Sequence, residues 1–208
     1  MGDEVKLEGN YLRVKDQRVR IISAGEPGTI PWDALEADVV IDATGKFLTQ
    51  EKLALHLKSG AKRVFLTRNP KNDIDRCVIP GVNDSSISLS DKIISTTSST
   101  TQVLALMMKM LDEAFGLKRA MMTTIHAYTA DQPLADVAGA DLRRSRSAVE
   151  NIIPNTTRSP ELVKKIMPQF DGKIQGIAFN VPVPNGSCVD LTSEFDQTPT
   201  VEEANNAI

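Results

Sequence analysis

The stretch STTSSTTQVLALMMKML, residues 95–111, marks the point where the pattern of predicted elements changes. Its first seven residues all carry hydroxyls, and the apolar run that follows predicts a buried helix over residues 100–111, ended by Gly116. Short strand-like runs and a helical segment precede this stretch, whereas longer strands follow it. We therefore predict a boundary between two domains near residues 95–99.

Three short apolar runs before the boundary predict a parallel sheet. They are DVVID at 38–42, RVFLT at 63–67 and KIIS at 92–95. Their apolar centres are nearly continuous, which is typical of strands buried on both faces. Between the first two, TQEKLALHLKSG predicts a helix with Thr49 as N-cap and Gly60 beyond its end, so this segment forms a βαβ unit. Nearer the N-terminus, YLRVKDQRVRII predicts an antiparallel hairpin near a sheet edge.

The residues after the boundary predict a different arrangement. AMMTTIHAYT, KIQGIAFNVPVP and SCVDLTSEF, which start at residues 120, 173 and 187, predict longer strands. A helix is expected to begin at Ser159 with Pro160 in its first turn, and a capping box of Thr200 and Glu203 predicts a short last helix. The fold class is therefore α/β, with a partial Rossmann-type parallel sheet followed by an α+β domain that has a mixed or antiparallel sheet.

Composition excludes several function classes. The chain is 41% apolar and 25% charged with a formal net charge of −3, so nothing drives it toward nucleic acid or a membrane surface. Cys77 and Cys188 lie far apart and form no CxxC pair, so we expect neither a disulfide framework nor a metal site. No secretory leader and no apolar run of membrane-spanning length is visible, which favours the cytoplasm.

The hydroxyl cluster is a candidate site for an anion. Backbone N–H groups at a helix start attract negative charge, so Ser98, Ser99, Thr100 and Thr101 can bind a phosphate or an oxyanion there. The alternative is structural, because Ser99 or Thr100 can simply cap the helix.

A histidine and a group of arginines are the other candidates. His126, in TTIHAYT, is either a general base or a hydrogen-bonded core residue of a strand. Arg143, Arg144 and Arg146, in DLRRSRS, either clamp a phosphate or form a solvated face that pairs with acids. A dinucleotide site is harder to find, since no strand carries a G-x-G-x-x-G loop and Gly25 and Gly28 lie in a proline-containing turn.

An ordered series of motifs makes the sequence resemble a known family. The series is IPWDALEADVVIDATG, HLKSGAKRV, PGVND, ISTTSSTTQ, TTIHAYTADQ, DLRRSRSAVENIIP and FNVPVPNGSCVDL. It is similar to phosphorylating glyceraldehyde-3-phosphate dehydrogenases and to the related erythrose-4-phosphate dehydrogenases, over essentially the whole chain. The resemblance implies a Rossmann NAD domain, here a remnant at 1–97 without its first βαβ unit, and a catalytic domain at 98–208 that is truncated at its C-terminus.

The resemblance also implies the site residues. In the family, a cysteine in S-C-T-T-N attacks a sugar-phosphate aldehyde, the histidine of H-A-Y-T acts as base, NAD takes the hydride, and phosphate releases the thioester during glycolysis. By motif, Ser99 occupies the nucleophile position, His126 is the base, and Thr44 and Gly45 lie along the cofactor. The positions that match substrate or phosphate contacts are Ser98, Thr100, Thr129, Arg143 and Thr157.

Several departures from the family pattern lower the expected activity. Serine replaces the reactive thiolate at Ser99, Gln102 replaces an asparagine, and Asn180 replaces a phosphate-binding arginine. Arg158 stands where the family usually has glycine, which re-aims the anion site. Without the glycine-rich loop, NAD binding is expected to be very weak.

The sequence therefore supports more than one functional hypothesis. The first is a protein of this family with little or no dehydrogenase activity, whose ligands are a sugar phosphate or inorganic phosphate. The alternative is a non-catalytic module that binds phosphate or contacts other subunits, or a vestigial fragment. Because AYTADQPLADVAGADLRRSR, residues 127–146, matches a family loop at the subunit interface, we expect a homo-oligomer or pairing with a related subunit.

Overall fold

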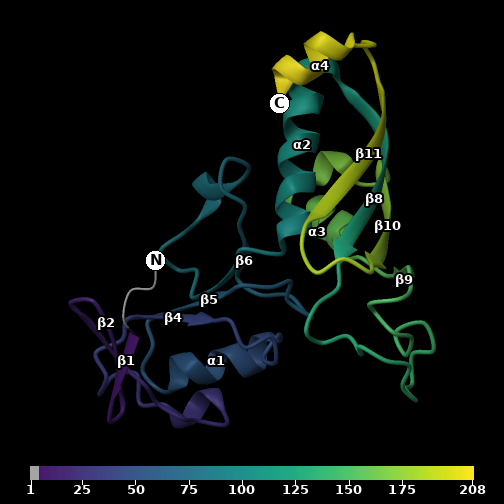
Figure 1. The fold of residues 1–208 in the computed structure, drawn as a ribbon. Coiled ribbons are helices and arrows are strands. Elements are labelled where there is room, and N and C mark those ends of the chain that lie inside the picture. Colours follow the sequence, from purple (N-terminus) through teal and green to yellow (C-terminus); the bar gives the residue numbers. More distant parts are fainter. Residues whose placement is uncertain (1–4) are drawn as a thin grey trace.

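The computed structural model describes residues 5–208, so the first four residues of the predicted domain 1–97 lie outside the described residues. Two sheets belong to the first half of the chain (Figure 1). One is antiparallel with the order β1-β2-β3 and contains β1 (Val5–Glu8), β2 (Tyr11–Val14) and β3 (Gln17–Arg20). The other is parallel with the order β4-β5-β7-β6 and contains β4 (Val39–Asp42), β5 (Arg63–Leu66), β6 (Arg76–Cys77) and β7 (Ile93–Ser95).

The second half contains a mixed sheet with the order β11-β8-β10-β9. Its strands are β8 (Leu117–Ala127), β9 (Ile153–Asn155), β10 (Ile174–Val181) and β11 (Ser187–Phe195). The α-helices of the chain are α1 (Gln50–Lys58), α2 (Ser99–Phe115), α3 (Ser159–Ile166) and α4 (Val201–Ala207). Short 3₁₀ helices cover Pro27–Thr29, Asp84–Ser86 and Pro168–Phe170. The α/β fold class with a parallel and a mixed sheet is thus confirmed.

The predicted helix ends agree with the local chemistry. Thr49 caps α1 by accepting a hydrogen bond from the backbone N–H of Lys52, and the predicted βαβ unit is present because β4 and β5 are parallel. Thr200 and Glu203 form the capping box of α4. Helix α2 is longer than predicted, and Ser98 caps it rather than Ser99 or Thr100. Its C-cap is Gly116, whose positive φ of 68° explains why the helix ends there.

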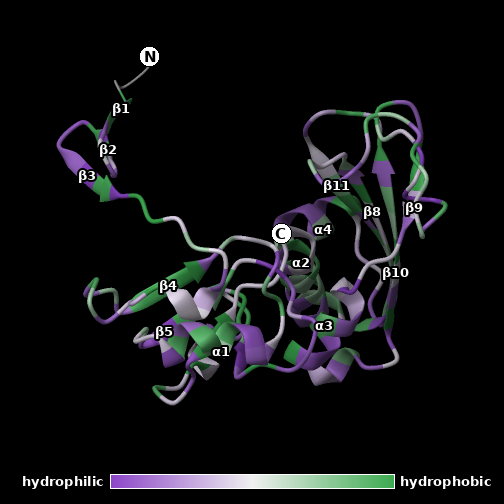
Figure 2. Ribbon diagram, turned by 90° about the horizontal axis from the view of Figure 1, so that it is seen from below, coloured by the Kyte–Doolittle hydropathy of each residue, from purple (hydrophilic) through white to green (hydrophobic). Residues whose placement is uncertain are grey.

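One expectation about the first half is confirmed and another is wrong. The hairpin of β2 and β3 is antiparallel and includes the edge strand β3, and it belongs to a separate three-stranded sheet, which stands apart from the rest of the molecule in Figure 2. Strand β4 is not buried on both faces, because Val40 is buried while Val39 and Ile41 are 52% and 67% exposed. β4 is also an edge strand of this sheet, so both this apolar face and one backbone edge of the strand are open.

The main core lies between the mixed sheet and the helices α2 and α3 (Figure 1). Leu104 and Met108 of α2, Val163 of α3, Met122 of β8 and Phe170 have fully buried side chains there. A smaller core around Leu53 joins α1 to the parallel sheet. Within residues 5–208, no helix is long and apolar enough to cross a membrane.

Candidate functional site

A cavity of about 610 Å³ lies where the two halves of the chain meet. Its floor is the end of the mixed sheet, with Thr124 and His126 on β8 and Ala178 and Asn180 on β10. These residues share one face because side chains alternate along a strand and His126 is paired in register with Asn180. The walls come from the segment after β5, from the starts of α2 and α3, and from the loop after β8.

The starts of helices α2 and α3 are joined beside this cavity. The Ser98 hydroxyl accepts a hydrogen bond from the backbone N–H of Thr101 and lies 2.9 Å from the Thr101 hydroxyl. The Thr101 hydroxyl donates in turn to Ser159 Oγ, at 3.0 Å, in the first turn of α3. Two helix N-termini therefore converge on one place, and their N–H groups favour an anion there.

The turn before α2 is held in an unusual backbone conformation. Thr97 is buried and has a φ of 63°, a left-handed geometry that is uncommon for a β-branched residue. The Ser95 hydroxyl accepts from the N–H of Thr97 and donates to the carbonyl of Arg68. The amide of Gln102 donates to the Thr96 carbonyl, so its longer side chain clamps the same turn.

The structure separates the predicted hydroxyl residues. Ser98, Thr100 and Thr157 line the cavity, but Ser99 is exposed and is not among the lining residues. Within residues 5–208, no hydrogen bond joins Ser99 to His126. His126 Nδ1 lies 2.7 Å from the carbonyl oxygen of Ala127, so Nδ1 carries a proton and donates. Nε2 is then the nitrogen of a neutral His126 that can accept a proton.

Asn180 is fixed where the family pattern has an arginine. It is 9% exposed, its carbonyl oxygen accepts from the amide of Asn155, and its amide lies 3.5 Å from the Ala127 carbonyl. It lines the cavity without contributing charge. The positive charge has to come from other elements.

Cations reach the cavity from loops on both sides. The lining cations are Arg68, Lys71, Arg144 and Arg158. Arg144, rather than the predicted Arg143, lines the cavity. The side chain of Arg158 pairs with Glu161 and donates to the carbonyl of Pro70, so it fastens α3 to the first half of the chain.

Asp131 lies among these cations. Thr129 donates a short hydrogen bond to its carboxylate, and Arg144 Nη2 lies 3.0 Å from it. The hydrogen bond from Thr129 is the main reason why the pKa of Asp131 lies below its usual value of 3.8. Arg144 is thus held by an ionised partner.

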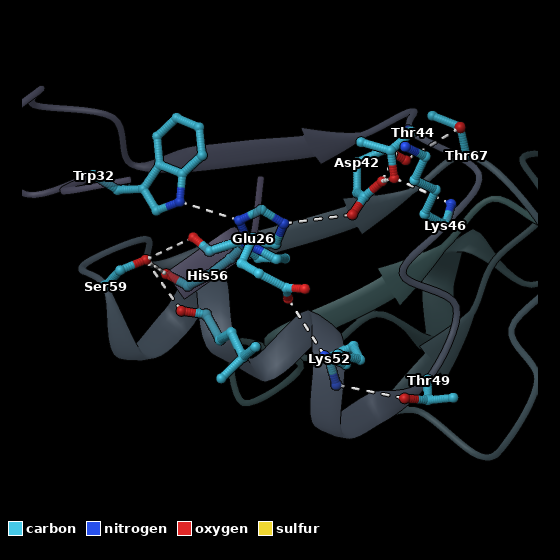
Figure 3. Close-up of polar contacts among 12 residues, drawn as sticks. Glu26, Trp32, Asp42, Thr44, Lys46, Thr49, Lys52, His56, Ser59 and Thr67 are labelled. Atoms are coloured by element: carbon cyan, nitrogen blue, oxygen red, sulfur yellow. Dashed lines mark hydrogen bonds and ion pairs between the residues drawn. The ribbon is translucent and has the colours of Figure 1, made fainter. Parts of the chain in front are cut away.

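The turn that carries Thr44 and Gly45, which were predicted to lie along the cofactor, is held by a chain of hydrogen bonds (Figure 3). Trp32 Nε1 donates to His56 Nδ1 at 3.1 Å, and His56 Nε2 lies 3.4 Å from Asp42. Since indole can only donate, the proton of neutral His56 is on Nε2 and points at the carboxylate. Asp42 accepts from the N–H and hydroxyl of Thr44, and Gly45 follows with a φ of 69°.

A dinucleotide site also needs a place for the pyrophosphate. Residues 5–208 contain no glycine-rich loop between a strand and a helix that would hold it. A Cβ at Gly45 would lie 3.0 Å from Nη1 of Arg68, so this guanidinium packs against the turn. Residues 5–208 therefore contain no loop of the kind that binds a pyrophosphate in dinucleotide sites.

Metal-dependent or thiol chemistry in the cavity would depend on the His, Cys, Asp and Glu residues of the described chain. Among residues 5–208, no group of three or more His, Cys, Asp or Glu residues could hold a metal ion. Cys77 does not line the cavity, and burial raises the pKa of its thiol. Cys188 is exposed on β11 and does not line the cavity either. Neither thiol replaces the missing nucleophile.

Sequence reasoning missed several lining residues. Arg68, Asn69 and Lys71 follow β5 directly, and ligands of open parallel sheets bind at the carboxyl ends of the strands. That rule was a usable signal for these three residues. Gln132 was missed because only the path of the loop after β8 brings it to the cavity.

Comparisons with known proteins agree with this architecture. The sequence pattern of the glyceraldehyde 3-phosphate dehydrogenase C-terminal domain matches residues 98–208, and that of its NAD binding domain matches residues 1–50. The chromosomal glyceraldehyde-3-phosphate dehydrogenase of Cupriavidus necator is 40% identical over 205 residues, and that of Geobacillus stearothermophilus is 41% identical over 206. Each alignment covers 99% of this chain and 61% of the relative, so the chain spans about three fifths of their length.

The C-terminal-domain pattern alone matches more than half of the chain. The chain therefore belongs to the glyceraldehyde-3-phosphate dehydrogenase family.

Proposed function

We propose that this chain binds a sugar phosphate or inorganic phosphate in the cavity and has little or no dehydrogenase activity of its own. The observation that carries the proposal is the convergence of the α2 and α3 N-termini on a cavity lined by hydroxyls and cations. Hydroxyls, helix N–H groups and guanidinium groups are the donors that phosphate oxygens accept best. We assign Ser98, Thr100 and Thr157 to phosphate binding, and leave Thr129, whose hydroxyl donates to Asp131, and Arg143 as the least supported contacts.

The chemistry at Ser99 supports the absence of turnover. The family reaction needs a thiolate, and a serine hydroxyl is not ionised to a comparable extent near neutral pH. An oxygen ester is also less reactive toward phosphate than a thioester. Ser99 is exposed and has no hydrogen bond to His126 in the described part of the chain, so nothing there activates it.

We also propose weak NAD binding, a split into a cofactor-type domain at 1–97 and a catalytic-type domain at 98–208, and a cytoplasmic location. The absence of a glycine-rich loop from residues 5–208 supports the first, and the change from a parallel to a mixed sheet supports the second.

A second candidate function is contact with another subunit. The loop after β8 exposes the large apolar side chains of Leu134, Val137 and Leu142, which are 66%, 52% and 81% exposed. Exposed apolar side chains grouped in one loop favour an interface with a protein. A second copy or a related subunit is the partner that this loop would contact.

The test of turnover uses the chain as it exists and Ser99→Cys. Both are incubated with NAD, phosphate and either glyceraldehyde 3-phosphate or erythrose 4-phosphate, and NADH formation is recorded. The wild-type chain is expected to stay at background, and calorimetry is expected to detect binding of inorganic phosphate. NADH formation only by Ser99→Cys would show that sulfur was the missing element, while silence of both would place the defect in cofactor binding as well. Turnover by the wild type within a few-fold of an ordinary family member contradicts the proposal.

A further inference from the structure

The cations of the cavity divide into paired and unpaired groups. Arg144 is paired with Asp131, and Arg158 is paired with Glu161. Across the described chain, no carboxylate forms an ion pair with Arg68 or Lys71, although both line the same cavity. The cavity therefore has positive charge that its own acids do not neutralise.

Arg68 is held at a defined place. The Ser95 hydroxyl bonds to its carbonyl at 2.7 Å, and the amide of the neighbouring Asn69 lies 3.4 Å from Ser98 Oγ. Its guanidinium packs against Gly45, at the turn between β4 and α1. The charge of Arg68 thus lies on the parallel-sheet side of the cavity. The hydroxyls and helix N-termini that attract anions lie at the starts of α2 and α3.

An arginine in this position discriminates between ligands by charge. A planar guanidinium matches a carboxylate with two parallel hydrogen bonds, whereas an aldehyde or alcohol offers it no charge. A cavity of about 610 Å³ is large enough for a small phosphate ester that reaches both sides. We infer that the preferred ligand is a phosphorylated carboxylic acid, with its phosphate at the starts of α2 and α3 and its carboxylate on Arg68. This inference rests on the proposed phosphate binding and adds the class of the ligand.

Calorimetric titration with matched probes tests the inference. The probes are 3-phosphoglycerate, glycerol 3-phosphate, which has an alcohol in place of the carboxylate, and inorganic phosphate. The wild-type chain is expected to bind 3-phosphoglycerate about tenfold more tightly than glycerol 3-phosphate, as one charge-assisted pair provides. In Arg68→Gln this preference is expected to fall to about twofold or less, because loss of the guanidinium weakens binding of the acid more than binding of glycerol 3-phosphate.

The control variant is Arg20→Gln, which removes an exposed arginine on β3 that does not line the cavity. It should keep the full preference for the acid. Equal wild-type affinity for the acid and the alcohol, or a preference that survives in Arg68→Gln, overturns the inference and leaves phosphate binding intact. Failure of the wild type to bind any of the three probes overturns the proposed function together with it.

Discussion

At the scale of single residues, Asp131 sets how much charge the cavity offers. Its folded-state pKa lies below the usual value of 3.8, mainly because Thr129 donates a hydrogen bond to the carboxylate. A lowered carboxyl pKa contributes stability that is fully present above the unfolded-state value and is lost as the pH falls through the folded-state pKa, here below about pH 4. At neutral pH Asp131 is therefore ionised and offsets the charge of Arg144.

We predict that Asp131→Asn strengthens binding of inorganic phosphate by about two- to fivefold, because it releases Arg144 from an exposed ion pair. The ratio of the two affinities should stay constant between about pH 5 and 8, since the carboxylate does not titrate there. Calorimetry at several pH values measures this ratio. Asp38→Asn, which breaks the exposed pair with Lys62, is the control and should leave phosphate affinity unchanged. Weaker binding by Asp131→Asn would mean that Asp131 orients Arg144 rather than neutralising it.

At the scale of elements, helix α2 connects the cavity to the core. Its N-cap Ser98 and its first-turn residue Thr100 line the cavity, and its buried face packs Leu104 and Met108 against the mixed sheet. The site is therefore positioned by packing several turns away. Loosening that packing should lower the stability of the second half of the chain.

We predict that Leu104→Ala lowers the free energy of unfolding by about 2–5 kcal/mol, because Leu104 is 0% exposed and its truncation leaves a cavity. Val103→Ala on the same helix should change it by only about 0.5 kcal/mol, since Val103 is 44% exposed. Urea unfolding followed by circular dichroism provides both values. Similar losses for the two variants would contradict the burial pattern of α2.

Elements were easier to predict than their surroundings. Thr49, Gly116 and the pair of Thr200 and Glu203 mark helix ends by local hydrogen bonding and backbone geometry, so sequence alone located them. The separate β1–β3 sheet and the exposed face of β4 depend on long-range packing that local patterns do not record.

Some residues of the site were also predictable from the sequence, whereas others depended on long-range contacts. Family motifs led to Ser98, Thr100, His126 and Thr157, which all line the cavity. They did not lead to Arg68, whose contact with Gly45 joins residues that are distant in sequence. They also favoured Arg143 over Arg144, because spacing within a loop does not determine which neighbouring side chain turns inward.

At the scale of the whole molecule, exposed apolar surface indicates self-association. Two of the regions that contribute it are the uncovered face of β4 and the loop that carries Leu134, Val137 and Leu142. They predict different behaviour. An edge strand that pairs with further copies leads to open-ended growth, whereas a closed subunit interface leads to one fixed stoichiometry.

We predict a fixed oligomer formed through the loop, because its apolar side chains are grouped and the β4 strand is only four residues long. Size-exclusion chromatography with light scattering should give one mass, a small multiple of the single chain, that stays constant over a range of concentrations. Leu142→Glu places a charge on a side chain that is 81% exposed and should shift the mass toward the single chain, while Leu89→Glu, at 83% exposed outside the loop, should not. Thermal unfolding of the Leu142→Glu chain then shows whether a single copy is self-sufficient, since a cooperative transition identifies a folded domain. The opposite result would be a mass that keeps rising with concentration and is reduced by Ile41→Glu but not by Leu142→Glu. It would assign association to β4 and count against the loop as an interface.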